Sequence, residues 1–268
     1  MLVVAACAVL VAVPTATGAF EGDRAKWWTR QIAELGQRPA GGLHERQAAA
    51  MVRRRFETLG YDVAVQRFRL PDGDRSLNVV ARTPGRVRVV AVAHMDGVRG
   101  TRAANDNGSG VGALLELARN LRGAHGVRLA ALGAEERVVT GSNYHLGSLR
   151  FTRGLSATSK AGIRLAVSLD MVGVGSTFHV RGLRSSPNRS ARRLLTRARA
   201  LGVRVSYLTD TGQSDHAELT RGGVPAAWVE WRWDNCWHEP CDRISRVKRS
   251  RLWVAGRVVL RATRAALD

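Results

Sequence analysis

Lysine, cysteine and aromatic residues are scarce in this sequence, and the near-complete use of arginine in place of lysine indicates a composition bias rather than a binding adaptation. Only Lys26, Lys160 and Lys248 are lysines, although Lys and Arg together number 42 and the net charge is +20. The arginines are spread along the chain, without an RNP-type signature, zinc-finger spacing or an aromatic-studded basic strand. We therefore expect no nucleic-acid binding, and weak association with an anionic cell envelope is the one surface role left for the charge.

Long apolar runs are also lacking, and the single marked one lies at the N-terminus. Leu2 to Val13 is too short to span a bilayer and suits the h-region of a signal peptide, with small residues before a cleavage site after Ala19. Because a basic n-region is missing, an upstream start is an alternative that would make Cys7 a lipid-anchor site. The apolar residues after Cys7 argue against that alternative. We predict a signal peptide at 1–19, a secreted or cell-envelope protein, and a single domain at 20–268.

Cysteine usage agrees with export. With Cys7 removed, Cys236 and Cys241 remain, in the segment CWHEPC. An oxidising compartment favours a small disulfide loop between them. The alternatives are two free thiols or a zinc knuckle, but two Cys and one His supply only three of the four ligands that a structural zinc site needs. We predict the disulfide.

Apolar periodicity predicts alternating strands and helices. The run from Val87 to Ala93 is apolar apart from Arg88, as in a central strand covered on both faces. Further strands are expected at 61–70, 77–81, 127–132, 164–169, 203–207 and 225–230, and helices at 22–35, 43–59, 109–122, 189–201, 215–221 and 245–266. This alternation predicts an α/β three-layer sandwich with a mixed, mostly parallel central sheet and helices on both faces.

One loop after the central strand has glycine spacing that resembles a dinucleotide-binding turn. Gly108, Gly110 and Ala113 follow the pattern G-x-G-x-x-A. However, about fourteen residues separate them from the strand end, whereas the fingerprint follows its strand almost immediately. Asp106 stands where it would repel phosphates, and no acidic residue lies at the ribose-binding distance. We expect these glycines to let a tight turn enter a closely packed helix.

Histidine and acidic residues follow several predicted buried strands, which favours a metal site. In open α/β sheets, ligands bind beyond the carboxyl ends of the strands. Each residue alone has a structural explanation; Asp106, for example, could cap the helix that begins near Ser109. Their recurrence favours a nitrogen and oxygen site for Zn²⁺ or a similar cation. The residues are His94, Asp96, Asp106, Glu135, Glu136, Asp170 and His238.

These motifs, in order, resemble a known family. The segments AHMD, ANDNGSGVGALLELAR, AEERVVTGS, SLDMVG, GQSDHAELTRGGVP and WHEPCD are similar to those of the secreted zinc aminopeptidases with a co-catalytic di-zinc centre, the bacterial leucyl-type enzymes and relatives. The resemblance runs from Leu35 to Asp242. It implies the zinc-exopeptidase (phosphorylase/hydrolase-like) fold, two Zn²⁺ per chain, peptide substrates and a monomer that hydrolyses N-terminal residues with water activated by the metals.

The resemblance also implies a ligand set. Asp106 would bridge both metals, His94 and Asp170 would complete one site, and Glu136 and His238 would complete the other. The adjacent carboxylates Glu135 and Glu136 would then have different roles, since Glu136 would bind metal and Glu135 would not.

Residues beside the ligands take their expected roles from the same resemblance. Glu135 would be the general base, and Asp96 would hydrogen-bond to the imidazole of His94. A cis peptide is implied at Asp106–Asn107. Asp215 would lie just outside the ligand shell, the structural alternative being a carboxylate at a helix N-terminus.

Tryptophans cluster near the last ligand. Trp237 occupies a position where some family aminopeptidases have a Tyr that stabilises the oxyanion, and an indole is a donor only. With Trp228, Trp231 and Trp233 it would line a side-chain pocket, although we expect at least half of the four to be core residues.

Three other functions remain open from sequence. Two are enzymes of the same fold, a carboxypeptidase and a glutaminyl cyclase that uses one zinc. The third is a non-catalytic metal-bearing receptor or adhesion module, which would be expected to lose Glu135 or a ligand.

Overall fold

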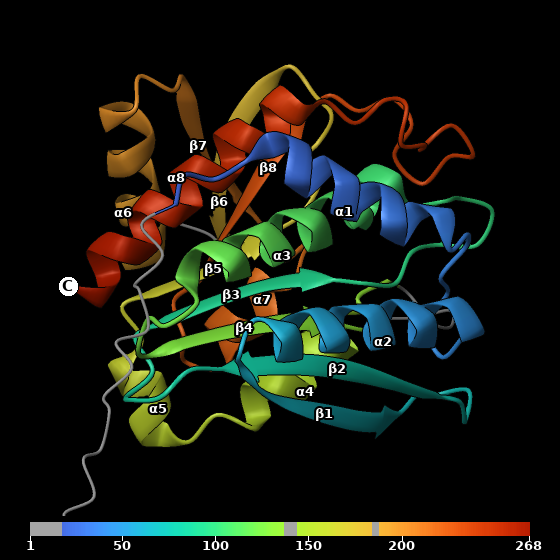
Figure 1. Cartoon of the computed structure of the whole chain (residues 1–268), viewed down its shortest axis with the longest axis horizontal. Helices are drawn as coiled ribbons and strands as arrows, with labels where there is room; N and C mark the ends of the chain where they lie inside the picture. Colours follow the sequence, from blue (N-terminus) through green and yellow to red (C-terminus); the bar gives the residue numbers. More distant parts are fainter. Residues whose placement is uncertain (1–17, 137–143, 184–187) are drawn as a thin grey trace, which may run out of the picture.

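One eight-stranded sheet with helices on both faces organises the computed structural model, which describes residues 18–136, 144–183 and 188–268 (Figure 1). The strands are β1 (Asp62–Arg69), β2 (Arg75–Arg82), β3 (Val89–His94), β4 (Val127–Leu132), β5 (Leu165–Leu169), β6 (Thr177–Leu183), β7 (Val205–Asp210) and β8 (Ala227–Arg232). The helices are α1 (Gly22–Glu34), α2 (Leu43–Thr58), α3 (Gly110–Leu121), α4 (Leu146–Arg153), α5 (Ala157–Gly162), α6 (Arg189–Ala200), α7 (His216–Arg221) and α8 (Arg249–Leu267), and a π-helical turn, η1 (Ala104–Ser109), precedes α3.

The strand order is β1-β2-β4-β3-β5-β8-β6-β7. Strands β4, β3, β5 and β8 are neighbours and run parallel. Antiparallel pairing begins on either side of them, between β2 and β4 and between β8 and β6. The mixed, mostly parallel sheet and the three-layer α/β class are therefore confirmed.

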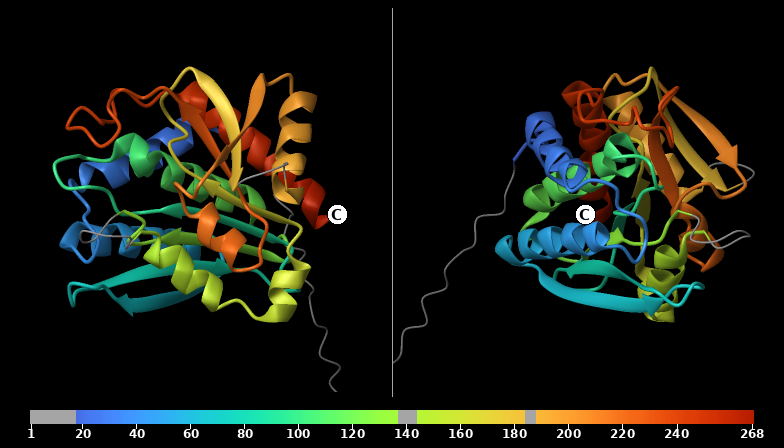
Figure 2. Two further views of the ribbon diagram at one scale, coloured as in Figure 1. Left: turned by 180° about the vertical axis from the view of Figure 1, so that it is seen from behind. Right: turned by 90° about the vertical axis from the view of Figure 1, so that its right-hand side faces the viewer.

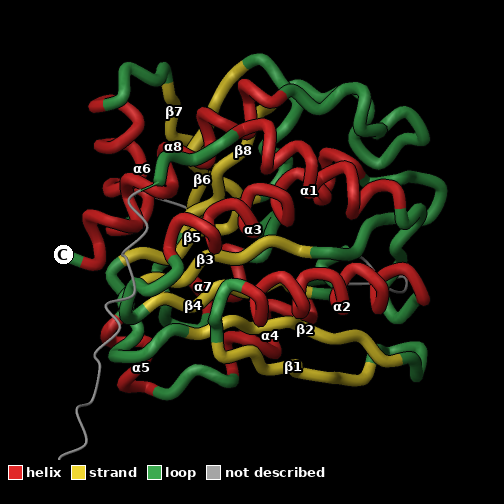
Figure 3. Tube along the Cα trace, in the orientation of Figure 1, coloured by secondary structure: helices red, strands yellow, loops and turns green. Residues whose placement is uncertain are grey.

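Alternation along the central strands creates a core on each face of the sheet. On β3, Val89 and Ala91 belong to the core that includes α1, α2, α3, α6 and α8, whereas Val90 and Val92 belong to the core that includes α4 and α7. Figure 2 shows the second helical layer from behind, and Figure 3 shows the strands between the two layers. Because every residue of β3 is buried, its continuous apolar run is the pattern expected of a strand covered on both sides.

The sequence prediction left three elements, β6, α4 and α5, unassigned. Strand β6 follows a segment that contains Gly173 and Gly175. Glycines at this spacing predict a turn, so the short strand that follows was not recognised. Helix α5 has no buried residue, so it offers no apolar periodicity to detect. Strand β7 also lies later than predicted, at Val205–Asp210 rather than 203–207.

The predicted signal peptide lies outside the described residues except for Gly18 and Ala19, and Cys7 lies outside them altogether. Within the part of the chain that the structure describes, no helix combines the length and apolarity needed to cross a bilayer.

A wholly buried arginine braces the segment between β3 and η1. Arg38 donates to the carbonyl oxygens of Met95 (2.8 Å), Arg102 (2.8 Å) and Ala103 (2.8 Å). It also donates to the carbonyls of Ile32 and Gly36. Burial lowers the pKa of Arg38 to about 10, against the opposing effect of nearby Asp96. The guanidinium therefore remains charged near neutral pH and ties α1 to the loop that leads into the site.

Replacing Arg38 by Lys should lower the free energy of unfolding by about 3 kcal/mol, because three ammonium donors cannot satisfy five carbonyls, three of them in buried hydrogen bonds. Urea denaturation followed by circular dichroism measures the change. The matched control is Arg53→Lys, an exposed residue paired with Glu57 on α2, which should shift stability by less than about 0.5 kcal/mol. Equal effects of the two substitutions would contradict the bracing role.

Candidate metal centre

Four of the predicted metal ligands and the predicted base, Glu135, lie at the carboxyl ends of four neighbouring parallel strands. His94 is the last residue of β3, and Asp170 directly follows β5. Glu135 and Glu136 follow β4, and His238 lies in the loop after β8. Because these strands are adjacent in the sheet, residues more than a hundred positions apart meet at one edge.

Asp106 reaches the same place from η1. Its backbone N–H and that of Asn105 donate to the carboxylate of Asp242, at 3.0 and 2.7 Å. The peptide bond between Asp106 and Asn107 is cis, as the family resemblance implied. Asp106 does not cap the following helix, because the side chain of Asn107 accepts from the N–H of Gly110 instead, at 2.8 Å. The carboxylate of Asp106 is thereby left for the site.

The glycines of this loop serve close packing. A Cβ on Gly110 would collide with the carbonyl oxygen of Leu169 at the end of β5, and one on Gly112 would collide with Thr29 of α1. Helix α3 can therefore lie against both elements only with glycine at these positions. For Gly110 this is the helix-entry role predicted from the sequence.

One cluster of the centre combines His94, Asp106 and Asp170. The Nε2 atom of His94 lies 3.2 Å from Oδ1 of Asp106 and 3.4 Å from Oδ1 of Asp170. All three side chains are at most 7% exposed.

A second cluster combines His238, Asp106 and Glu136. The Nε2 atom of His238 lies 3.3 Å from Oδ2 of Asp106 and 3.1 Å from Oε1 of Glu136. The two oxygens of Asp106 thus face different histidines, so one carboxylate joins the two clusters.

The donor set fits divalent cations. Both ring nitrogens of His94 and Oδ1 of Asp170 are buried without a hydrogen-bond partner among the described residues. Ligand atoms of His94, Asp106 and Glu136 lie within 4.8 Å of one another, as do those of His94, Glu135 and Asp170. Imidazole nitrogens and carboxylate oxygens are the ligands that Zn²⁺ takes in catalytic sites. A shared cation would give these buried atoms the partners that the fold does not.

The electrostatics of the cluster also favour positive charge. Burial would lower the pKa of His238, but its contacts with Asp106 and Glu136 raise it to about 10. Burial, followed by the charge of Asp106, raises the pKa of Glu136 to about 7. Burial opposes a positive charge on His94 as well, yet Glu135 and Asp170 raise the pKa of its imidazole well above the usual value. The carboxylates therefore stabilise cations placed between them.

Asp96 takes a different contact from the one predicted. Its Oδ1 lies 3.6 Å from Nδ1 of His94, which is beyond hydrogen-bond range. Its two oxygens instead accept the backbone N–H groups of Glu135 (3.1 Å) and Glu136 (3.0 Å). Asp96 is completely buried and so holds the main chain of both glutamates in place.

Glu135 has a neighbour that the sequence did not reveal. Nε2 of His145 lies 3.3 Å from Oε1 of Glu135, and the backbone N–H of His145 donates to the carbonyl of Glu135 at 2.8 Å. Burial, opposed by His94 and reinforced by Glu136, raises the pKa of Glu135 well above its usual value. His145 lies in no strand or strand-end motif of the sequence, so no local signal marked it.

Asp215 lies in the core beside the centre. It is completely buried, and at the N-terminus of α7 its side chain caps no backbone N–H of that helix. The helix-terminus alternative therefore has no support from hydrogen bonding. Burial, opposed by His94, raises the pKa of Asp215 to about 7.

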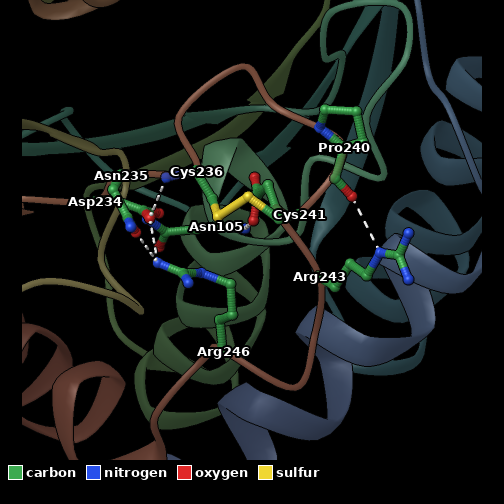
Figure 4. The surroundings of a disulfide bond; sticks show 9 residues. Asn105, Asp234, Asn235, Cys236, Pro240, Cys241, Arg243 and Arg246 are labelled. Carbon is green, nitrogen blue, oxygen red and sulfur yellow. Dashed lines mark hydrogen bonds and ion pairs between the residues drawn. A yellow bond between two sulfur atoms is a disulfide. The ribbon is translucent and has the colours of Figure 1, made fainter.

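The predicted disulfide is confirmed and closes the loop that carries His238. Cys236 and Cys241 are bonded (Figure 4). Asp234 accepts from the N–H of Cys236 (3.0 Å), from the side chain of Asn105 (2.8 Å) and from Arg246 (2.8 Å). This loop is therefore attached to η1, the element that carries Asp106.

The four tryptophans divide evenly between core and surface. Trp228 and Trp231 are buried, whereas Trp233 and Trp237 are 72% and 54% exposed. The ring of Trp237 lies 4.3 Å from that of His238. All four line a cavity of about 570 Å³ that opens on the metal centre.

The same cavity contains an ion cluster that sequence analysis missed. Arg181 of β6 is buried, and it pairs with Asp210 at 3.1 Å and with Glu230 at 3.2 Å. Because β6 itself was not predicted, nothing in the sequence placed Arg181 near the centre.

The fold and the site define a class: an α/β protein with a buried carboxylate–histidine centre, suited to divalent cations, at the carboxyl ends of its parallel strands. Residues 78–263 match the sequence profile of Peptidase family M28. The chain belongs to this family.

Individual proteins are also similar to this chain. Aminopeptidase YwaD of Bacillus subtilis is 31% identical over 192 residues, which cover 67% of this chain and 41% of that protein. Leupeptin-inactivating enzyme 1 of Streptomyces exfoliatus is 25% identical over 241 residues, which cover 79% of this chain and 53% of that protein. The chain thus spans about half or less of the length of these curated relatives.

Solved structures share the fold at lower identity. A zinc aminopeptidase of Bacillus subtilis, BSAP, superposes with a TM-score of 0.85 at 20% identity, covering 92% of this chain and 95% of that one. A glutaminyl cyclase of Porphyromonas gingivalis superposes with a TM-score of 0.81 at 22% identity, covering 92% and 98%. These likenesses concern the fold, which serves both activities.

Proposed function

We propose that this chain is a secreted di-zinc aminopeptidase that removes N-terminal residues from peptides. The observation that carries the proposal is the pair of clusters joined by Asp106, with one histidine and one further carboxylate on each side. His94 and Asp170 would hold one zinc ion, and Glu136 and His238 the other.

Two bound zinc ions supply Lewis-acid chemistry: they polarise the scissile carbonyl and acidify the attacking water. Glu135 takes the proton that this water loses as its oxygen attacks the carbonyl carbon. The same carboxyl group then gives the proton to the leaving amine nitrogen as the C–N bond breaks. Asp96 accepts a hydrogen bond from the backbone N–H of Glu135 and so keeps Glu135 aligned. The contact with His145 limits the directions that the Glu135 carboxylate can take. The products are a free amino acid and a peptide shortened by one residue.

One carboxylate of the centre supports binding of an amino terminus rather than a carboxyl terminus. Glu135 is an additional carboxylate beside those that would be committed to metal, and it attracts an α-ammonium group rather than a second anion. The names of the relatives point the same way, since YwaD is an aminopeptidase. The cyclase alternative has support from the fold alone.

Three matched peptides test the reaction. We expect cleavage of a free peptide and of its C-terminally amidated form, and none of the N-acetylated form, because the α-amine is needed for binding. Dialysis against 1,10-phenanthroline should abolish cleavage, and added Zn²⁺ should restore it. Mass spectrometry identifies the products. Cleavage of the N-acetylated peptide, activity that survives chelation, or pyroglutamate as the sole product from an N-terminal Gln peptide would each contradict the proposal.

We further propose export through the 1–19 signal peptide, a monomeric state, and only weak association with anionic envelope surfaces. The apolar h-region and the Cys236–Cys241 disulfide support export, since such bonds persist in oxidising compartments.

A further inference from the structure

A buried guanidinium forms part of the wall of the cavity beside the metal centre. Arg181 is 7% exposed, and its three nitrogens donate separately to Asp210, Glu230 and Gln213. Its planar group also lies over the ring of Trp228, 4.3 Å from the centroid. A guanidinium has five N–H groups, and these described contacts use three of them.

Trp228 connects this wall to the candidate ligands. The indole N–H of Trp228 donates to the backbone carbonyl of Asp170 at 3.0 Å. Arg181 is thus separated from a predicted metal ligand by a single side chain. A substrate whose scissile bond lies at the centre would therefore extend its terminal side chain along this wall.

The charges on the wall are already nearly balanced. Arg181 faces Asp210 and Glu230, and Arg232 approaches the same Oε1 of Glu230 at 3.8 Å. An acidic substrate side chain would add a third carboxylate to the cluster, and a basic one would add a third cation. Either would leave a charge without its own partner beside the buried Arg181 and Glu230.

The wall nevertheless offers both kinds of hydrogen-bonding group. Arg181 can only donate, and the carboxyl group of Glu230, whose pKa burial raises to about 7, offers an acceptor oxygen. Tryptophan rings form the apolar sides of the same cavity, including Trp231 and Trp233. A side chain with an apolar stem and an uncharged tip that both donates and accepts complements these features.

We propose that Arg181 and Glu230 form the end of the subsite for the N-terminal side chain and select a primary carboxamide, that of Gln or Asn. This inference rests on the proposed aminopeptidase function. The amide oxygen accepts from Arg181, and the amide nitrogen donates to Glu230. An aliphatic side chain of the same shape leaves both groups unpaired, and that loss makes a hydrogen-bonding site selective.

The competing structural explanation is that Arg181 only anchors the turn after β7. That turn is already fixed in part without it, because Oδ1 of Asp210 accepts from the N–H groups of Gly212 (2.7 Å) and Gln213 (3.3 Å). A purely anchoring role predicts equal losses for all substrates when Arg181 is changed, whereas a selecting role predicts unequal ones.

The test compares substrates of matched shape on the zinc-loaded protein. The pairs are Asn with Leu and Gln with Met, each as an aminoacyl coumarylamide, and Glu and Lys derivatives complete the panel. We expect kcat/KM for Asn and Gln to exceed that of the matched partner at least about tenfold, with Glu and Lys lower still. Arg181→Met and Glu230→Met should each reduce the ratio within a pair to about one. Losses common to both members, including partial unfolding or metal loss, cancel in that ratio.

A control variant and a binding measurement complete the design. Arg257→Met removes another arginine stacked on a tryptophan, Trp253 at 4.2 Å on α8, and should leave the ratio unchanged. Calorimetry of the unmodified protein with the free amino acids should show tighter binding of Gln than of Met, without any need for a variant to fold.

The outcomes separate the two proposals. If none of the panel is hydrolysed, the aminopeptidase function fails. If the panel is hydrolysed but Leu and Met match or exceed Asn and Gln, or if a charged side chain is preferred, this inference alone fails. A preference that persists in Arg181→Met would also overturn it.

Discussion

Replacing Glu135 by Gln should lower kcat by roughly a thousandfold, because the amide cannot accept the proton of the attacking water. The substitution keeps the length and shape of the side chain, and the backbone N–H that donates to Asp96 is unaffected. We therefore expect KM for an aminoacyl anilide to change little. Steady-state kinetics on the zinc-loaded variant measure both quantities.

The metal content of the same variant provides the control. Glu135 lies close enough to His94 and Asp170 to share a cation with them, so a ligand role is the alternative to a base role. Two zinc ions retained with activity lost support the base. Loss of one ion would assign Glu135 to the ligand set, and a variant that keeps more than a tenth of kcat would refute both roles.

Replacing Asp106 by Asn should remove both metal ions and abolish hydrolysis, a larger effect than any other ligand substitution. One Asp106 oxygen faces His94 and the other faces His238, so this carboxylate belongs to both clusters. An amide carries no negative charge to balance two adjacent dications. Zinc per chain, measured by atomic absorption after gel filtration, should fall from two to near zero, and kcat by at least about a thousandfold.

Single-cluster ligands give the matched comparison. Asp170→Asn and Glu136→Gln each change a carboxylate of one cluster, so each should leave about one zinc ion, held by the other cluster. Asp72→Asn, an exposed residue remote from the centre, should leave zinc content unchanged. Retention of both ions by Asp106→Asn would contradict the bridging arrangement, as would loss of both ions from either single-cluster variant.

The strand ends explain why so much of the centre was visible in the sequence. A buried parallel strand reads as an unbroken apolar run, so the polar residue at its end is conspicuous, as His94 is at the end of β3 and Asp170 is directly after β5. Parallel neighbours end at the same edge of the sheet, and the convergence of these residues follows from the topology. The order of the motifs then indicated the family.

The contacts around the ligands were less predictable. Asp96 was expected to hydrogen-bond to His94; it lies 3.6 Å from that ring, and its hydrogen bonds go to the backbone of Glu135 and Glu136. His145 and Arg181 were not anticipated at all. The position of His145 depends on a backbone hydrogen bond to Glu135, and that of Arg181 depends on the pairing of β6 with β8. Neither contact leaves a periodic signal in the sequence.

The sequence by itself therefore determined the α/β class, the strands that carry the centre, the ligand candidates and the Cys236–Cys241 pairing. Local patterns suffice for these features, because a strand buried on two faces has an apolar run and the motifs have a fixed spacing and order in the sequence. Only the tertiary structure decided that Asp106 divides its oxygens between two histidines and that Arg181 and Glu230 face the same cavity. Such contacts join strands and loops distant in sequence, and their geometry is set by how the layers pack rather than by any segment alone.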